Sequence, residues 1–267
     1  MVNINRSQIK SGVIKGFSIL FLIVLVFTSF VWLIEKSTAT LYIIGDSTVH
    51  SGPNKSGLFG WGSFLGSYFK NKRLRIENRA SGGASSRSFL NSGLWYKVLI
   101  NLKAGDFLII QFGHNDSGSF ETSSKIKGTI KGSGSEEKEI YNAITKEHEI
   151  VHTYGWYLSK FITDAHSKGV EVFVCSPIPR NHWRQNKVVR ASADYGKWSE
   201  EVTKRNKAFF IDLNELIAAK YEALGKEKVS SFFPKDRAHT NLEGARLNAK
   251  AVFEGIENLP ACKLKQF

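Results

Sequence analysis

Short apolar runs alternate with longer, helix-like stretches through most of the chain. The runs that predict strands are Leu41–Ile44, Leu74–Glu77, Phe107–Phe112, Val170–Cys175 and Ala208–Ile211. The stretches that predict helices are Gly62–Lys72, Leu94–Leu102, Lys146–Lys168, Ala193–Arg205 and Leu242–Ile256. This alternation predicts an α/β fold around a mainly parallel sheet. Gly118–Lys138, rich in Ser, Gly, Lys and Glu, interrupts it and predicts a long surface loop, either a lid over substrate or a solvated insertion.

The first 39 residues follow a different pattern. Phe17–Ile34 contains no charged residue, and basic residues precede it. Such a segment is typical of a secretory signal peptide or of a single membrane anchor, and the small residues Ser37 and Ala39 suit cleavage before Thr40. We therefore expect residues 1–39 to be a signal peptide or an anchor and residues 40–267 to form one domain. The protein is then exported, and is secreted, periplasmic or anchored.

Charge and cysteine content limit the classes of partner. The chain of 267 residues has 37 Lys and Arg against 24 Asp and Glu, a net charge of +13. Such a field attracts anionic partners, among them nucleic acid, anionic lipid and acidic polysaccharide. No nucleic-acid recognition motif occurs, so we expect no nucleic-acid partner. The two cysteines, Cys175 and Cys262, could form one disulfide, although Cys175 fits a buried strand, and no Cys/His cluster has zinc-ligand spacing.

Polar residues with complementary chemistry follow the predicted strands. In a parallel sheet, functional groups collect beyond the carboxyl ends of the strands. Ser47 follows the first strand and is a candidate nucleophile, which requires a base to accept its proton. His239 is the candidate base, and Asp236, three residues earlier, can orient its imidazole and stabilise the imidazolium.

Acyl transfer by a serine also requires donors for the oxyanion that forms on the carbonyl oxygen. We expect these donors to be the backbone N–H groups of Ser47 and Gly83 and the side-chain amide of Asn115. Gly83 lies in the turn after the second strand, and Asn115 follows the third. Each motif alone is common in turns, but their order along the chain favours a serine esterase.

These motifs resemble the four sequence blocks of the SGNH, or GDSL-type, hydrolases. The blocks are Gly45-Asp46-Ser47, the turn at Gly83, Gly113-His114-Asn115-Asp116 and Asp236-x-x-His239. Further stretches are similar to the rhamnogalacturonan acetylesterases, and they include Gly60-Trp61-Gly62, Ser85-Ser86-Arg87-Ser88-Phe89, His152-Thr153-Tyr154-Gly155-Trp156, Ser176-Pro177-Ile178-Pro179-Arg180 and His239-Thr240-Asn241.

The resemblance implies a three-layer, flavodoxin-like fold with a five-stranded sheet. It also implies that the protein removes acetyl groups from pectin through an acyl-enzyme intermediate, without a metal or an organic cofactor. Carried over by motif, Ser47 is the nucleophile, Gly83 and Asn115 complete the oxyanion hole, and Asp236 and His239 complete the triad.

Several residues near the catalytic motifs could contact an acidic polysaccharide. Arg87 and Arg180 could each bind a galacturonate carboxylate, or could form a structural ion pair. Trp183 could stack on a sugar or pack against the core, and His114 could touch substrate or stabilise its own turn. His152 and Trp156, on one face of a predicted helix, are assigned to the core.

Other functions remain open at this point. An esterase acting on another acetylated glycan such as xylan, or a lipase or lysophospholipase, would use the same motifs; a lipase would need an apolar groove. A non-catalytic protein that binds polysaccharide or membrane through its basic surface is the alternative outside enzymes. The leading prediction is a monomeric esterase whose partner is an acetylated acidic polysaccharide.

Overall fold

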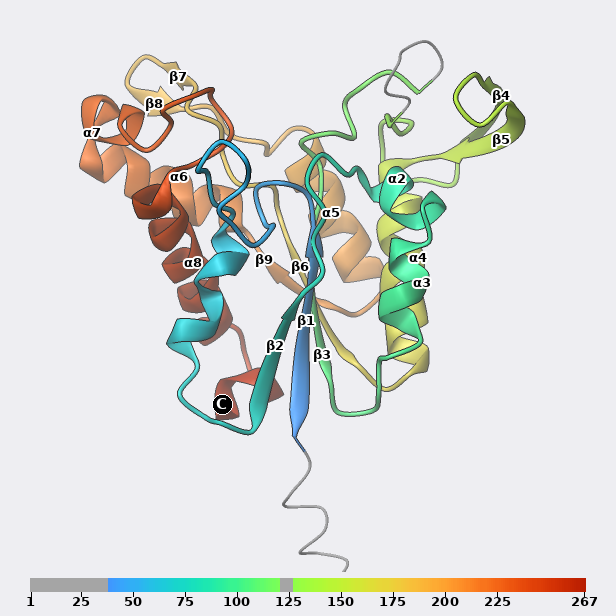
Figure 1. The fold of residues 1–267 in the computed structure, drawn as a ribbon, viewed down its shortest axis with the longest axis horizontal. Coiled ribbons are helices and arrows are strands. Elements are labelled where there is room, and N and C mark those ends of the chain that lie inside the picture. Colours follow the sequence, from blue (N-terminus) through green and yellow to red (C-terminus); the bar gives the residue numbers. More distant parts are fainter. Residues whose placement is uncertain (1–37, 121–126) are drawn as a thin grey trace, which may run out of the picture. The chain divides into compact units, whose positions relative to one another are not determined.

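Five parallel strands form the central sheet, in the order β2-β1-β3-β6-β9 (Figure 1). They are β1 (Ala39–Gly45), β2 (Leu74–Asn78), β3 (Phe107–Gln111), β6 (Glu171–Cys175) and β9 (Phe209–Ile211). The structure is a computed structural model that describes residues 38–120 and 127–267. All five strands coincide with the predicted apolar runs to within two residues at either end. The predicted signal peptide or anchor lies, apart from its last residues, outside the described part of the chain.

The two faces of the sheet are covered by different helices (Figure 1). Successive side chains of a strand point to opposite faces, so Leu41 and Ile43 join one buried cluster while Tyr42 and Ile44 join the other. One face packs against α6 (Leu213–Leu224), α8 (Leu242–Glu257) and the 3-10 helices η1 (Trp61–Ser63), η2 (Leu65–Tyr68) and η3 (Lys263–Gln266). The other packs against α2 (Ser86–Asn91), α3 (Leu94–Leu99), α4 (Tyr154–Ser167) and α5 (Tyr195–Arg205). Burial on both faces explains why the inner strands β1, β3 and β6 read as nearly continuous apolar runs.

Two of the predicted helices are wrong in extent. Gly62–Lys72 forms only the short 3-10 helices η1 and η2. The predicted helix over Lys146–Lys168 contains a strand, β5 (Glu147–His152), and only then α4. Thr153 separates them: its side chain accepts a hydrogen bond from Trp156 N at 3.0 Å and caps the helix.

A hairpin that the pattern did not predict precedes α4. β5 pairs with β4 (Glu137–Asn142), and Ile140 and Val151 are the buried members of this hairpin. The predicted loop Gly118–Lys138 therefore ends in a strand, and its residues 121–126 lie outside the described ones. His152 and Trp156 do not share a helix, yet their rings stack at 3.8 Å between centroids across the junction of β5 and α4.

Both cysteines are free and buried, Cys175 within the sheet as predicted. No helix in the described part of the chain is long and apolar enough to cross a membrane. The loops that follow β1, β2, β3 and β6 all lie at one edge of the sheet, the upper edge in Figure 1. The short hairpin β7 (Trp183–Arg184) and β8 (Lys187–Val188) and the helix α7 (Lys226–Ser230) lie at the same edge. This edge carries the candidate site.

Candidate active site

The turn after β1 presents Ser47. Gly45 must be glycine because a Cβ there would lie 2.5 Å from Gln111 O and 2.6 Å from the side chain of Val49. After it the chain turns sharply, and the N–H groups of Val49 and His50 both donate to Asp46 O, at 3.1 and 3.0 Å. This turn leaves Ser47 partly exposed between two buried neighbours, Asp46 and Thr48.

Ser47, His239 and Asp236 form a continuous chain of hydrogen bonds. Ser47 Oγ lies 2.8 Å from His239 Nε2, although 192 residues separate them in sequence. His239 Nδ1 lies 2.7 Å from Asp236 Oδ2, while Asp236 Oδ1 accepts the backbone N–H groups of Ala238 and His239 at 2.7 and 2.8 Å. Burial alone would raise the pKa of Asp236, but these N–H groups and the imidazole lower it below its ordinary value. Asp236 therefore stays ionised beside His239.

A bridge joins the loop that carries Ser47 to the loop that carries His239. Phe59 N donates to Thr240 O at 2.9 Å, and Thr240 Oγ1 donates to Phe59 O at 3.0 Å. Because the bridge involves the residue next to His239, it restrains the imidazole relative to the nucleophile loop.

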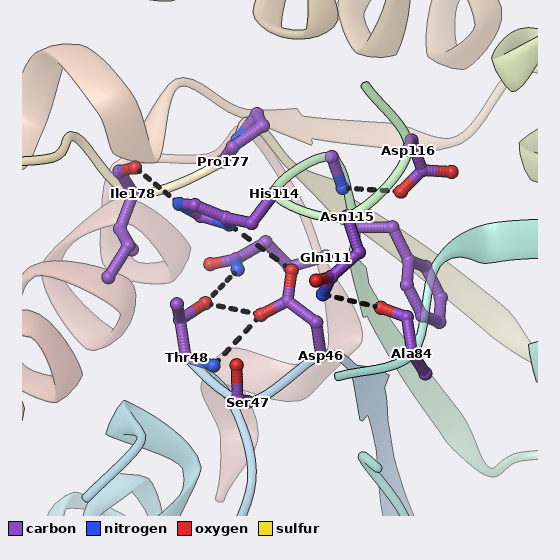
Figure 2. Close-up of polar contacts among 12 residues, drawn as sticks. Asp46, Ser47, Thr48, Ala84, Gln111, His114, Asn115, Asp116, Pro177 and Ile178 are labelled. Carbon is purple, nitrogen blue, oxygen red and sulfur yellow. Dashed lines mark hydrogen bonds and ion pairs between the residues drawn. The ribbon is translucent and has the colours of Figure 1, made fainter. Parts of the chain in front are cut away.

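Asp46 connects the nucleophile loop to His114, as Figure 2 shows. Its carboxylate is fully buried, accepts the N–H and hydroxyl of Thr48 at 2.8 and 2.7 Å, and lies 3.1 Å from His114 Nδ1. Burial alone would raise the pKa of Asp46, but His114 and Thr48 hold it below its ordinary value. The other nitrogen of His114 lies 3.1 Å from Ile178 O. Each ring nitrogen of His114 is therefore engaged with an oxygen atom, which fixes the orientation of the ring.

Two of the candidate oxyanion donors, Gly83 and Asn115, lie in the turns that follow β2 and β3, at the same edge of the sheet as Ser47. Asn115 Nδ2 donates to Ala84 O at 2.9 Å, which orients the amide and leaves its second N–H available (Figure 2). Gly83 has φ +72°, a conformation that favours glycine, and its carbonyl accepts Lys127 Nζ at 2.5 Å. Gly82 lines the cavity beside Ser47, and the peptide that follows it carries the Gly83 N–H.

Asp116 ties together the segments that carry these donors. Its side chain accepts the N–H and hydroxyl of Ser86, at 3.0 and 2.5 Å, and the N–H of Gly113 at 3.0 Å. Burial raises the pKa of Asp116 to about 7, against these three hydrogen bonds, which favour the charged form. Gly113, with φ +133°, must be glycine because a Cβ would lie 2.7 Å from Pro177.

The cavity beside Ser47 is small. It measures about 110 Å³ and is lined by Ser47, His50, Asn54, Leu58, Phe59, Gly60, Gly82 and His239. Typical pockets for drug-sized ligands measure about 300–1,000 Å³, so this one suits a short acyl group better than a fatty acyl chain. The structure therefore provides no support here for the apolar groove that a lipase would need.

For Arg87 and His114, the structure favours the structural alternative over a substrate contact. Arg87 is buried, donates Nε and Nη2 to the Glu149 carboxylate at 2.7 and 2.6 Å, and donates Nη1 to Gly128 O. It forms the structural ion pair instead, because the unpredicted hairpin delivers Glu149 to it. His114 is 8% exposed and has both ring nitrogens engaged, which supports the role of stabilising its turn, although it also lines a cavity of about 220 Å³.

The other two expected contacts remain accessible. Arg180 is exposed, with Nη2 donating to His114 O at 3.3 Å, and lines a cavity of about 220 Å³. Trp183 packs partly against the core, as one of its two expected roles requires, and it also lines a separate hollow, so that stacking on a sugar stays a prediction.

Sequence reasoning missed Lys127 and Asp116. Lys127 had been grouped with a solvated loop, yet its ammonium lies against Gly83. Only the Asn115-Asp116 pairing in the motif could have pointed to Asp116. In the described ranges, no group of three or more His, Cys, Asp or Glu side chains could hold a metal ion.

Comparison with known proteins adds independent information. Residues 43–247 match the model of the GDSL-like lipase/acylhydrolase family. A rhamnogalacturonan acetylesterase of Emericella nidulans is 31% identical over 218 residues, which cover 81% of this chain and 84% of the relative. A probable rhamnogalacturonan acetylesterase of Bacillus subtilis is 30% identical over 82% of this chain and 93% of its own length. The acetylxylan esterase Axe2 of Geobacillus stearothermophilus has a TM-score of 0.56 at 14% identity, covering 84% of this chain and 97% of that chain, and confirms the predicted fold.

Proposed function

The chain belongs to the GDSL-like lipase/acylhydrolase family and is a carboxylic ester hydrolase, and we propose that it removes acetyl groups from rhamnogalacturonan, an acidic polysaccharide. The observation that carries this proposal is the hydrogen-bonded chain from Ser47 through His239 to Asp236. The relatives that act on rhamnogalacturonan support the choice of polysaccharide, and the net charge of +13 suits a polyanion.

In the first half of the reaction, Ser47 Oγ attacks the acetyl carbonyl carbon while His239 Nε2 accepts its proton. Asp236 stabilises the imidazolium that results, because its carboxylate accepts the Nδ1 proton. The oxyanion is stabilised by the N–H groups of Ser47 and Gly83 and by the free N–H of Asn115, each contributing roughly 3 kcal/mol. Collapse of the intermediate breaks the bond to the sugar oxygen, which takes the proton from His239 and leaves as an alcohol.

In the second half, water hydrolyses the acetyl group on Ser47. His239 now removes a proton from the water, which attacks the acetyl carbon, and the same donors stabilise the second oxyanion. Ser47 Oγ leaves with the proton returned by His239, and acetate is released. The cavity of about 110 Å³ beside Ser47 limits the acyl group to a short one.

Acetate release provides the test. Wild type and Ser47→Ala are incubated with purified acetylated rhamnogalacturonan, acetylated xylan and a long-chain ester, and free acid is measured. We expect release from rhamnogalacturonan by wild type alone, with lower activity on the other two substrates. Equal release by both proteins would falsify the mechanism. A preference for xylan or for the long-chain ester would mean that rhamnogalacturonan is not the preferred substrate.

A further inference from the structure

A second hollow opens between the loop after β6 and the loop that carries His239. It measures about 250 Å³ and is lined by Asn181, His182, Trp183, Lys226, Ser230 and Arg237. Asn181 N donates to Arg237 O at 2.8 Å, which joins the two loops at the hollow. Arg237 follows Asp236 directly and precedes His239 by two residues, so the residues that line the hollow adjoin the catalytic residues in sequence.

Among the residues that the structure describes, the two cations of this hollow, Lys226 and Arg237, have no anionic partner. Lys226 and Arg237 are both exposed, and no carboxylate among the described residues lies within 4.0 Å of either. No acidic side chain lines the hollow. Lys228, on the same helix as Lys226, is by contrast paired, since its Nζ lies 2.7 Å from Glu243. Two unpaired cations facing one hollow suit a carboxylate, which a guanidinium can grip through parallel hydrogen bonds.

Trp183 supplies an apolar surface beside these cations. Its indole N–H donates to Asn181 Oδ1 at 2.8 Å, and its ring packs partly against the core, so the side chain is fixed in place. A fixed aromatic ring can stack on the apolar face of a sugar. His182 lines both this hollow and the cavity of about 220 Å³ that contains Arg180, so the basic surface continues toward that cavity.

We propose that this hollow binds the carboxylate of a uronic acid residue that neighbours the acetylated sugar. Arg237 and Lys226 are its ionic partners, and Trp183 lies against the sugar ring. The proposal rests on the proposed function and deepens it, since it assigns the part of the surface that selects an acidic polysaccharide. A uronate held here would anchor the polymer beside Ser47 without touching the reacting atoms.

Binding to a catalytically inactive protein tests the hollow directly. Ser47→Ala is titrated calorimetrically with a rhamnogalacturonan hexasaccharide that lacks acetyl groups, and with the same hexasaccharide after its carboxylates are reduced to alcohols. The titrations are repeated with Lys226→Gln and Arg237→Gln added. Lys235→Gln is the matched control, because Lys235 is exposed on the same loop and does not line the hollow.

We expect Ser47→Ala to bind the acidic form at least about tenfold more tightly than the reduced form. Adding Lys226→Gln and Arg237→Gln should remove most of that preference, whereas Lys235→Gln should retain it. An unchanged preference in the protein that lacks both cations would overturn the proposal.

Kinetics separate this proposal from the proposed function. In the active enzyme, the two substitutions should lower kcat/KM for acetylated rhamnogalacturonan about tenfold more than kcat/KM for p-nitrophenyl acetate. Equal losses on both substrates would mean that the substitutions disturb the loop that carries Asp236 and His239, and would also overturn the proposal. If wild type cleaves the aryl ester but releases no acetate from the polymer, the proposed function is wrong, while the titrations still decide whether the hollow binds a uronate.

Discussion

Replacing Asp236 with Asn should disable His239 while leaving the loop in place. The amide oxygen can keep the role of Oδ1, which accepts two backbone N–H groups at 2.7 and 2.8 Å. The amide NH₂ then faces His239 Nδ1, where the wild type has an acceptor at 2.7 Å. Nδ1 must become an acceptor, so the ring proton moves to Nε2, which can no longer accept the proton of Ser47. The opposite orientation of the amide would point a donor at both backbone N–H groups and is disfavoured.

The expected loss follows from this change of tautomer. The equivalent substitution in serine proteases lowers kcat about 10⁴-fold, which corresponds to roughly 5.4 kcal/mol of transition-state stabilisation. We expect a loss of that size for Asp236→Asn, measured as kcat for p-nitrophenyl acetate near pH 8, with little change in melting temperature. Asp164→Asn is the matched control, since Asp164 lies on α4 and pairs with Lys160. A loss below about tenfold in a fully folded variant would refute the assignment of Asp236 as the orienting carboxylate.

Two further predictions concern stability. Glu149→Ala leaves buried Arg87 without its carboxylate and should lower the free energy of unfolding in urea by about 3 kcal/mol. The control is Glu139→Ala on the same hairpin, where the side chain is exposed, and it should lower the free energy of unfolding by less than about 0.5 kcal/mol. Equal losses would contradict the buried ion pair. Asp116 has a pKa of about 7 when folded and about 3.9 when unfolded, so from about pH 4 to about pH 7 the unfolded chain loses a proton that the folded protein keeps. Wild type should therefore lose stability relative to Asp116→Asn as the pH rises through that window, and a constant difference in urea unfolding at about pH 4.5 and 7.5 would contradict the raised pKa.

The central sheet could be predicted because its inner strands, β1, β3 and β6, are buried on both faces. The run through Leu41–Ile44 has no polar position to confuse the assignment, and Phe107–Ile110 in β3 behaves similarly, whereas the edge strand β2 alternates apolar and polar residues. The hairpin β4-β5 was missed because most of its side chains are exposed and polar, and only two of its hydrophobic side chains, Ile140 and Val151, are buried. A polar, charged stretch of this kind carries little signal for a strand.

The residues of the candidate site likewise divide into those that the sequence predicts and those that it does not. Ser47, Asn115, Asp236 and His239 follow predicted strands or occur in spaced motifs, so their positions could be argued from sequence. The partners of other polar groups depend on long-range packing, which no local pattern records. Glu149 reaches Arg87 from a segment 62 residues away. Nothing in the sequence around Lys226 or Arg237 indicates that they face one hollow.

The bridge between Phe59 and Thr240 has a consequence for how this protein becomes active in the cell. Ser47 precedes His239 by 192 positions in the chain, so the two meet only when the segment that carries His239 has docked on the sheet. A nascent or truncated polypeptide thus carries a chemically inert serine. Hydrolytic power arises in a single late event, so the appearance of turnover during refolding reports completion of the whole domain rather than of any local part.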